Sequence, residues 1–204
     1  MKKNTKQRIF DTAVDLFSRQ GYAGTSIREI AYAAGIKESS VYNHYKNKED
    51  ILQSIFDYFR EEITSRRPPE KEMLKIIDAI SPAEVIKLIF LKYGQTENAT
   101  IDKIAKIIFS QQFINQQASD FVLNAEIREP ITYYENILAI MARANRIKEC
   151  DFRAIAAELH YGFLGIIMEY SHVKKEGEYD KETVKKLIRH VDFVFEHVQI
   201  VNQT

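Results

Sequence analysis

Side chains that exchange hydrogen bonds crowd into one short stretch near the N-terminus, residues 35–50 (GIKESSVYNHYKNKED). Its hydroxyl, amide and phenol groups suit contacts to base edges or phosphates, and its lysines add positive charge: Ser39, Ser40, Tyr42, Asn43, Lys46 and Lys48. A plain helix start, with His44 as a surface imidazole, accounts for the same residue types. Residue chemistry alone leaves these two interpretations about equally favoured.

The predicted elements favour the first interpretation. Periodic apolar residues predict a helix from residue 5 to Gly21 and a shorter one from residue 27 to 34, and a third follows near 38–45. Ser26 and Glu29 have the spacing of a capping box, and Thr25 and Ser26 open a helix whose amide groups favour phosphate. Two such helices joined by a tight turn are typical of a helix-turn-helix, which places its second helix in the major groove of DNA. Val41 and Tyr45 are expected to face inward.

Residues 25–52 (TSIREIAYAAGIKESSVYNHYKNKEDIL) resemble the DNA-binding domain signature of the TetR family of transcriptional regulators. The resemblance covers roughly residues 5–60 and depends on residues at fixed spacing: Thr25, Ile30, Ala31, Ala34, Gly35, Val41, Tyr42, His44, Tyr45, Lys48, Glu49 and Leu52. It implies that Tyr42 and Lys48 hold phosphates. It also implies that Lys37, Ser39, Ser40 and Asn43 face bases or the backbone of DNA, and we include His44 in the same predicted DNA-binding set.

Two positions depart from the family's usual pattern. Lys37 stands where a capping Ser or Thr is common, and the loss of that cap costs on the order of 1 kcal/mol. Glu38 stands where Lys or Arg is frequent, and its carboxylate would repel phosphates. We hypothesise that Glu38 accepts a hydrogen bond from the amino group of a cytosine.

The fold class predicted for the whole chain is all-α, with about nine helices. The 204 residues include only seven glycines and four prolines, whereas β-sandwiches and barrels need frequent turn residues. Two prolines in RRPPE (66–70) interrupt the helical pattern most strongly, so we expect a DNA-binding domain over 1–65 and an effector-binding and dimerisation domain over 66–204. Pro130 should kink or split a helical segment predicted over 118–146.

Charge and cysteine content bound the partners and the compartment. The first fifty residues carry nine Lys or Arg against six Asp or Glu, a net of +3, which leaves −3 for the rest of a neutral chain. This asymmetry is weak support for a basic contact surface. Cys150 is the only cysteine, and no apolar run is long enough to cross a membrane. A cytoplasmic protein without metal or cofactor is expected.

The rest of the chain suggests a dimer and a ligand site. The resemblance implies that the last two helices, over 151–174 and 180–198, pair with those of a second copy through Ile155, Leu159, Gly162, Phe163, Ile166, Val184, Leu187, Val191 and Phe195. A pocket for an apolar or aromatic molecule is expected among Phe59, Phe90, Tyr93, Phe109, Phe113, Tyr133, Tyr134 and Met141. An intramolecular helix pair and an ordinary core are the alternative interpretations of these two sets.

These features predict a homodimeric transcriptional regulator that acts as a repressor: it binds a near-palindromic double-stranded DNA operator and is released when a small molecule binds. A constitutive DNA-binding protein without an effector is the first alternative. A small helical enzyme is the second, although the sequence shows no arrangement of catalytic residues.

Overall fold

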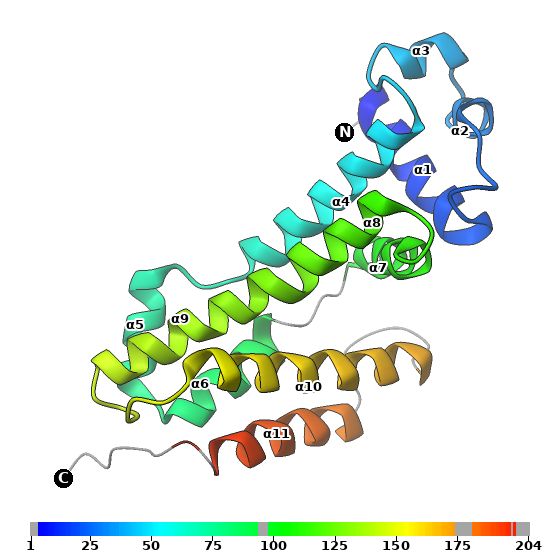
Figure 1. The fold of residues 1–204 in the computed structure, drawn as a ribbon. Helices are drawn as coiled ribbons and strands as arrows, with labels where there is room; N and C mark the ends of the chain where they lie inside the picture. The colour runs from blue at the N-terminus through cyan, green and yellow to red at the C-terminus, as the bar shows by residue number, and fades with distance from the viewer. Residues whose placement is uncertain (1–3, 94–97, 174–180, 197, 199–204) are drawn as a thin grey trace. The chain divides into compact units, whose positions relative to one another are not determined.

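The computed structural model describes residues 4–93, 98–173, 181–196 and 198, and these form eleven α-helices and two π-helical segments (Figure 1). The described residues include no strand, so the predicted all-α class is confirmed. The chain divides into two compact units. The first consists of Met1–Thr64 and Asn98–Asn124, and the second of Ser65–Glu97 and Ala125–Thr204.

The first unit is built around a helix-turn-helix. Its helices are α1 (Thr5–Gln20), α2 (Ile27–Ala33), α3 (Glu38–Tyr42), α4 (Lys48–Ser65), α7 (Ala99–Gln111) and α8 (Gln116–Phe121). Local chemistry sets several of their ends. α1 stops at Gly21, whose φ of 81° is accessible to glycine without strain. The predicted capping box of Ser26 and Glu29 is present, and Asn47 accepts the amide of Asp50 at the start of α4.

α7 and α8 complete the core of this first unit, although the sequence analysis assigned them to the second domain. The buried face of α7, Ile101, Ile104, Ile107 and Ile108, packs in one cluster with the apolar faces of α1 and α4. Lys103 on α7 also forms an ion pair with Asp15 on α1, at 2.8 Å. The apolar pattern of α7 predicts a buried face, but not which distant helix covers it.

The second unit contains α5 (Glu70–Ala79), α6 (Pro82–Leu88), η1 (Ile89–Tyr93), α9 (Glu129–Arg143), α10 (Phe152–Val173) and α11 (Lys181–Phe195). The π-helical segment η2 (Val122–Arg128) begins in the first unit and ends in the second. α10 packs against both α9 and α11 (Figure 1). The core of the second unit includes fully buried side chains from α9, α10 and α11: Leu138, Met141, Leu159, Leu187 and Val191.

The segment predicted over 118–146 is helical without a gap from Gln116 to Arg143, but its hydrogen-bonding pattern changes before Pro130. It consists of α8, the π-helical segment η2 and α9, with Pro130 in the first turn of α9. A proline has no amide hydrogen and its ring clashes with the preceding turn, so it is tolerated best near a helix start. η2 ends directly before that start.

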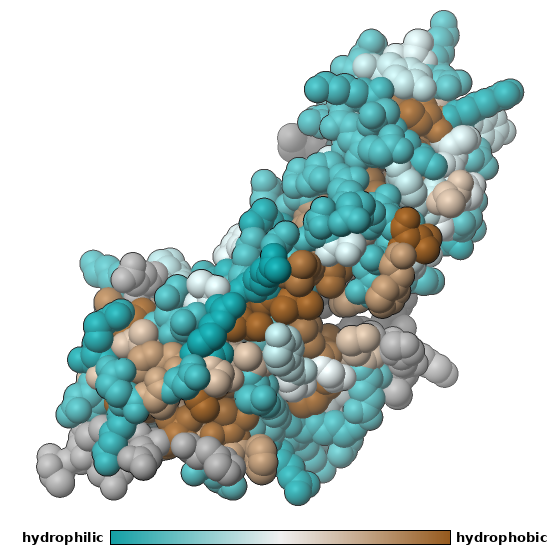
Figure 2. Space-filling view, in the orientation of Figure 1, coloured by the Kyte–Doolittle hydropathy of each residue, from teal (hydrophilic) through white to brown (hydrophobic). Residues whose placement is uncertain are grey.

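Surface character differs between the elements. Figure 2 shows a mostly hydrophilic surface over α1–α4 and apolar side chains gathered over α9 and α10. Within the described part of the chain, no helix is long and apolar enough to span a bilayer.

Candidate nucleic-acid interface

The short helix α3 is anchored from one side. Val41 and Tyr45, with 0% and 4% of their surface exposed, lie in the core as predicted. The opposite side and the flanking turns are therefore accessible: Lys37, Glu38, Ser39, Tyr42, Asn43, His44 and Lys46 are exposed, and Ser40 is partly exposed. α3 ends at Tyr42, before the predicted end near residue 45, and Asn43 occupies its C-cap. Lys37 occupies the N-cap without a side-chain hydrogen bond, as its departure from Ser or Thr predicts.

The two residues that open α2 are placed differently from one another. Ser26 is exposed and accepts the amide of Glu29 through its hydroxyl at 3.2 Å, while its own amide donates to the Glu29 carboxylate at 2.7 Å. Thr25 is buried, and its hydroxyl donates to the carbonyl oxygen of Gly21 at 2.9 Å. The Thr25 hydroxyl therefore holds the loop before α2, whereas Ser26 lies on the surface.

Lys48 joins the start of α4 to that same loop. Its ammonium group donates to the carbonyl oxygens of Tyr22 and Thr25, at 2.9 Å each, and lies 4.2 Å from the centre of the Tyr22 ring. The side chain is partly buried. The sequence analysis assigned Lys48 to a phosphate, but here the ammonium group stabilises the fold.

A second contact, between Tyr22 and Glu49, also joins the loop before α2 to the start of α4. The Tyr22 hydroxyl donates to the Glu49 carboxylate at 2.9 Å. Burial, aided by this carboxylate, raises the pKa of Tyr22 well above its usual range, so the phenol keeps its proton. Hydrogen bonds from its own amide and from Tyr22 hold the pKa of Glu49 below its ordinary value.

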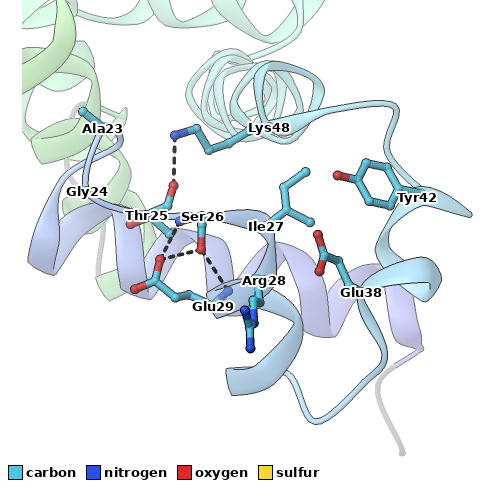
Figure 3. A pocket seen from close by; sticks show the side chains of 10 residues that line it. All are labelled: Ala23, Gly24, Thr25, Ser26, Ile27, Arg28, Glu29, Glu38, Tyr42 and Lys48. Atoms are coloured by element: carbon cyan, nitrogen blue, oxygen red, sulfur yellow. Dashed lines mark hydrogen bonds between the residues drawn. The ribbon is translucent and has the colours of Figure 1, made fainter.

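A shallow depression of about 430 Å³ lies between α2 and α3 (Figure 3). It is lined by Ala23, Gly24, Thr25, Ser26, Ile27, Arg28, Glu29, Glu38, Tyr42 and Lys48. Glu38 and Tyr42 extend from α3 toward Ile27 (Figure 3). The sequence analysis missed Arg28, an exposed cation in the first turn of α2. Its position two residues after the capping Ser26 was the signal, because a cation there lies beside the proposed phosphate site.

The eight residues predicted for a ligand pocket belong to two different units. Phe59, Phe109 and Phe113 lie in the first unit, where Phe59 is buried in the core and Phe113 is 88% exposed. The second unit contains Phe90, Tyr133, Tyr134 and Met141, all in or against its core. Tyr93 ends η1, and its side chain lies outside the described residues. The residues predicted from the sequence to line one pocket therefore belong to two separate clusters in the structure.

The residues predicted for a dimer interface also separate into two groups. Four are buried within the single chain, in the core between α10 and α11: Leu159, Leu187, Val191 and Phe195. Gly162 faces the ring of His190, whose Nε2 lies 3.1 Å from the carbonyl oxygen of Leu159. Partial exposure is retained by Ile155, Phe163, Ile166 and Val184. Some of the residues predicted for a dimer interface therefore form the contact between α10 and α11 within one chain.

Together, the fold and this surface define a helix-turn-helix unit whose second helix, α3, has one exposed side. Residues 9–59 match the family model described as bacterial regulatory proteins, tetR family. The resemblance predicted from the sequence is confirmed.

Two transcriptional regulators are similar in sequence to part of this chain. The negative transcriptional regulator IcaR of a biofilm operon in Staphylococcus epidermidis is 43% identical over 58 residues, 26% of this chain and 31% of that protein. The transcriptional regulator AcrR of Shigella flexneri is 44% identical over 55 residues, 27% of this chain and 26% of that protein. This chain therefore aligns with less than a third of the length of either relative.

The whole chain shares its fold with solved structures. A putative TetR-family transcriptional regulator from Mesorhizobium loti superimposes with a TM-score of 0.73 at 17% identity, over 96% of each chain. At this identity the similarity shows the fold alone.

Proposed function

We propose that the protein is a homodimeric transcriptional repressor that binds a near-palindromic operator and releases it when a small molecule binds the second unit. The exposed side of α3 carries this proposal. Val41 and Tyr45 bury the other side, so the hydrogen-bonding groups of Glu38, Ser39 and Asn43 are presented together, at the N-terminal end of the helix and directly after it. A recognition helix contacts base edges chiefly through the residues near its N-terminal end.

Each exposed group suits a particular part of DNA. Asn43 has the amide that pairs with both N6 and N7 of adenine, and Glu38 accepts from the amino group of cytosine. Tyr42, Lys46 and the amide groups that start α2 are suited to phosphates, which fix the register without reading sequence. Arg28 adds a cation at the edge of the depression.

A dimer follows from the symmetry of operators and from the surface of α10. Tyr161, Gly165 and Met168 recur at intervals of four and three residues, and all three are exposed, so they form one stripe along the helix. Phe193 of α11 is also exposed. In the proposed dimer a second copy of the chain covers these apolar side chains, and each copy reads one half-site about one helical turn, ~34 Å, from the other.

The first unit contains the means to receive a signal. Phe121, the last residue of α8, packs on Phe56 and Phe59 of α4, with ring centres 5.0 and 6.2 Å apart. α4 in turn carries Lys48, which holds the loop before α2. A shift of Phe121 would therefore reach the helix-turn-helix through α4. The effector must bind the released state more tightly than the DNA-bound state, by a coupling of typically ~1–3 kcal/mol.

The test is a binding selection from random DNA with the full chain. The expected result is a near-palindrome, and Asn43→Ala should weaken binding to it by ~1–3 kcal/mol while relaxing the preference at one base in each half-site. Asn136→Ala on α9, exposed and far along the sequence, is the matched control and should change nothing. Enrichment of no sequence, or equal effects of the two variants, would refute the proposal.

The same selection tests Glu38. If its carboxylate accepts from cytosine, Glu38→Ala should lose the preference for cytosine at one position and bind all sequences somewhat more tightly, because a negative charge is removed from the DNA surface. An unchanged base preference would eliminate this role for Glu38.

A further inference from the structure

Four aromatic rings of the second unit form a continuous cluster with the imidazole of His160. Tyr133 and Tyr134 of α9 have ring centres 5.5 Å apart, and Tyr134 lies 5.9 Å from the imidazole of His160 on α10. Phe163, one turn further along α10, stacks at 6.3 Å from His160 and contacts Phe90 of η1 at 4.6 Å. His160 is only 3% exposed, an unusual place for an imidazole.

The hydrogen bond of His160 fixes its tautomer. Nε2 lies 2.7 Å from the backbone carbonyl oxygen of Glu126, and because a carbonyl oxygen only accepts, Nε2 carries the hydrogen. Burial lowers the pKa of His160 below its ordinary value, and nearby Arg67 acts in the same direction, so the ring is neutral near pH 7. Nδ1 is then a bare acceptor.

That acceptor is unsatisfied. Nδ1 of His160 is buried and has no hydrogen-bond partner among the described residues. Buried polar atoms are nearly always hydrogen-bonded, and an exception calls for an explanation. The atom requires a donor that the described part of the protein does not supply.

Arg67 and two acidic residues, Glu126 and Glu129, lie close to one another beside the cluster. The Arg67 guanidinium lies 4.7 Å from the centre of the Tyr133 ring, and the carboxyl group of Glu126 is close enough for Arg67 to lower its pKa against the larger effect of burial. A cation and an acid together give an ionic ligand no clear advantage. Glu126, Tyr133 and Phe163 each retain some accessible surface at the edge of the cluster.

We propose that this cluster binds a neutral aromatic molecule that donates a hydrogen bond, a phenol in the simplest case, with its hydroxyl on Nδ1 of His160 and its ring among Phe90, Tyr134 and Phe163. The inference rests on the proposed function, because this would be the effector site. Aromatic rings favour offset or edge-to-face contacts with another ring, and the acceptor selects for the hydroxyl. Of the residues predicted for a pocket, Phe90, Tyr133 and Tyr134 belong here, whereas His160 and Phe163 were not among them.

The site is joined to the helix-turn-helix by η2. Glu126, whose carbonyl oxygen accepts from His160, lies within η2, and Phe121 directly precedes this segment and packs on α4. π-helical segments are rare and recur at functional sites. A ligand that moves His160 changes the hydrogen bonding of η2, and the chain carries that change to Phe121.

The experiment uses the full chain with ¹⁵N-labelled histidine, p-cresol as the probe and toluene as a probe of similar shape without the hydroxyl. The nitrogen resonances of His160, identified with His160→Gln, should show the Nε2–H tautomer in the free protein. p-Cresol should then shift the Nδ1 resonance, and toluene should not. p-Cresol should also bind about tenfold more tightly, as expected for one hydrogen bond to a buried acceptor.

His160→Phe keeps a ring but removes the acceptor, so its affinities for the two probes should become equal. The wild-type resonances answer the question even if that variant fails to fold. An Nδ1–H tautomer, equal binding of the two probes by the wild type, or binding of neither would overturn the inference. None of these measurements involves DNA. A chain that binds p-cresol at His160 but no operator would refute the proposed repressor and leave this site standing, and the reverse result would refute this site alone.

Discussion

At the scale of single residues, Lys48 shows how one side chain stabilises the helix-turn-helix. Its ammonium group donates to two backbone carbonyl oxygens and lies over the Tyr22 ring. Lys48→Met keeps the length of the side chain but leaves both oxygens without this donor. We therefore expect the free energy of unfolding to fall by about 1–3 kcal/mol, measured by urea denaturation.

Lys46→Met is the matched control for this prediction, because Lys46 is exposed. It should change the free energy of unfolding by less than about 0.5 kcal/mol and instead lower the salt dependence of operator binding by about one charge. Equal stability of the two variants would show that the contacts of Lys48 contribute nothing to the fold.

Glu126 predicts a dependence of stability on pH. Burial raises its pKa from 4.5 to about 7, with Glu129 adding to the increase and Arg67 opposing it. Between these values the folded chain keeps a proton that the unfolded chain releases, so the contribution of Glu126 to stability falls as pH rises from 4.5 to about 7. Glu126→Gln does not titrate. Relative to this variant, the wild type should lose up to about 3 kcal/mol across the window, and parallel curves in urea denaturation at each pH would contradict the shift.

The most predictable features were those that depend on residues a few positions apart in the sequence. The capping box of Ser26 and Glu29, the Asn47 cap and the inward Val41 and Tyr45 all depend on spacings of a few positions, which the sequence displays directly. The opposite placement of Thr25 and Ser26 was not predictable, because both are small hydroxyl residues before a helix. Only the packing of the loop against Gly21 and Lys48 distinguishes them.

At the scale of elements, the pairing of α10 with α11 explains two glycines of one helix. A Cβ at Gly162 would overlap the His190 ring of α11, whereas a Cβ at Gly165 would meet nothing within 4 Å. Gly165→Ala should therefore stabilise the protein by up to about 1 kcal/mol through helix propensity. Gly162→Ala has the same gain but must displace His190, so it should be about 1–3 kcal/mol less stable than Gly165→Ala.

Thermal unfolding of the two variants at one protein concentration checks this comparison. Equal melting temperatures would mean that α11 yields to the added methyl group at no cost. The sequence placed Gly162 in a predicted dimer interface, with an intramolecular helix pair as the alternative, and in the structure α11 of the same chain lies against Gly162. A stripe of apolar residues along a helix does not show whether the helix that covers it belongs to the same chain.

At the scale of the whole molecule, the features that could not be predicted from the sequence are those that depend on packing between distant segments of the chain. The proline pair at 68 and 69 precedes α5 and lies close to the boundary of the first unit at Thr64, so that boundary was visible locally. The return of α7 and α8 to the first unit was not. Their buried residues fit any apolar surface, and only contacts such as Lys103 with Asp15 specify α1 as the partner. The aromatic residues predicted for one pocket were divided between the two units for the same reason.

The dimer is the remaining prediction at this scale, and it now depends on a smaller set of residues. Since Leu159, Leu187, Val191 and Phe195 are buried within one chain, the proposed dimer uses the exposed stripe of α10 instead. Tyr161 and Met168, 53% and 46% exposed, are the side chains to change. Replacing both with arginine places two cations in the proposed interface, where they are desolvated without a partner.

Sedimentation velocity should then show a monomer for the double variant Tyr161→Arg/Met168→Arg and a dimer for the wild type. Tyr32→Arg is the matched control, since Tyr32 is 88% exposed on α2 in the other unit, and it should stay dimeric. Loss of the dimer also removes the link between two half-sites, which should weaken operator binding by about a hundredfold or more even though α3 is unchanged. A double variant that remains dimeric would assign the interface to another surface, and a monomeric variant with full operator affinity would show that the two copies read DNA independently.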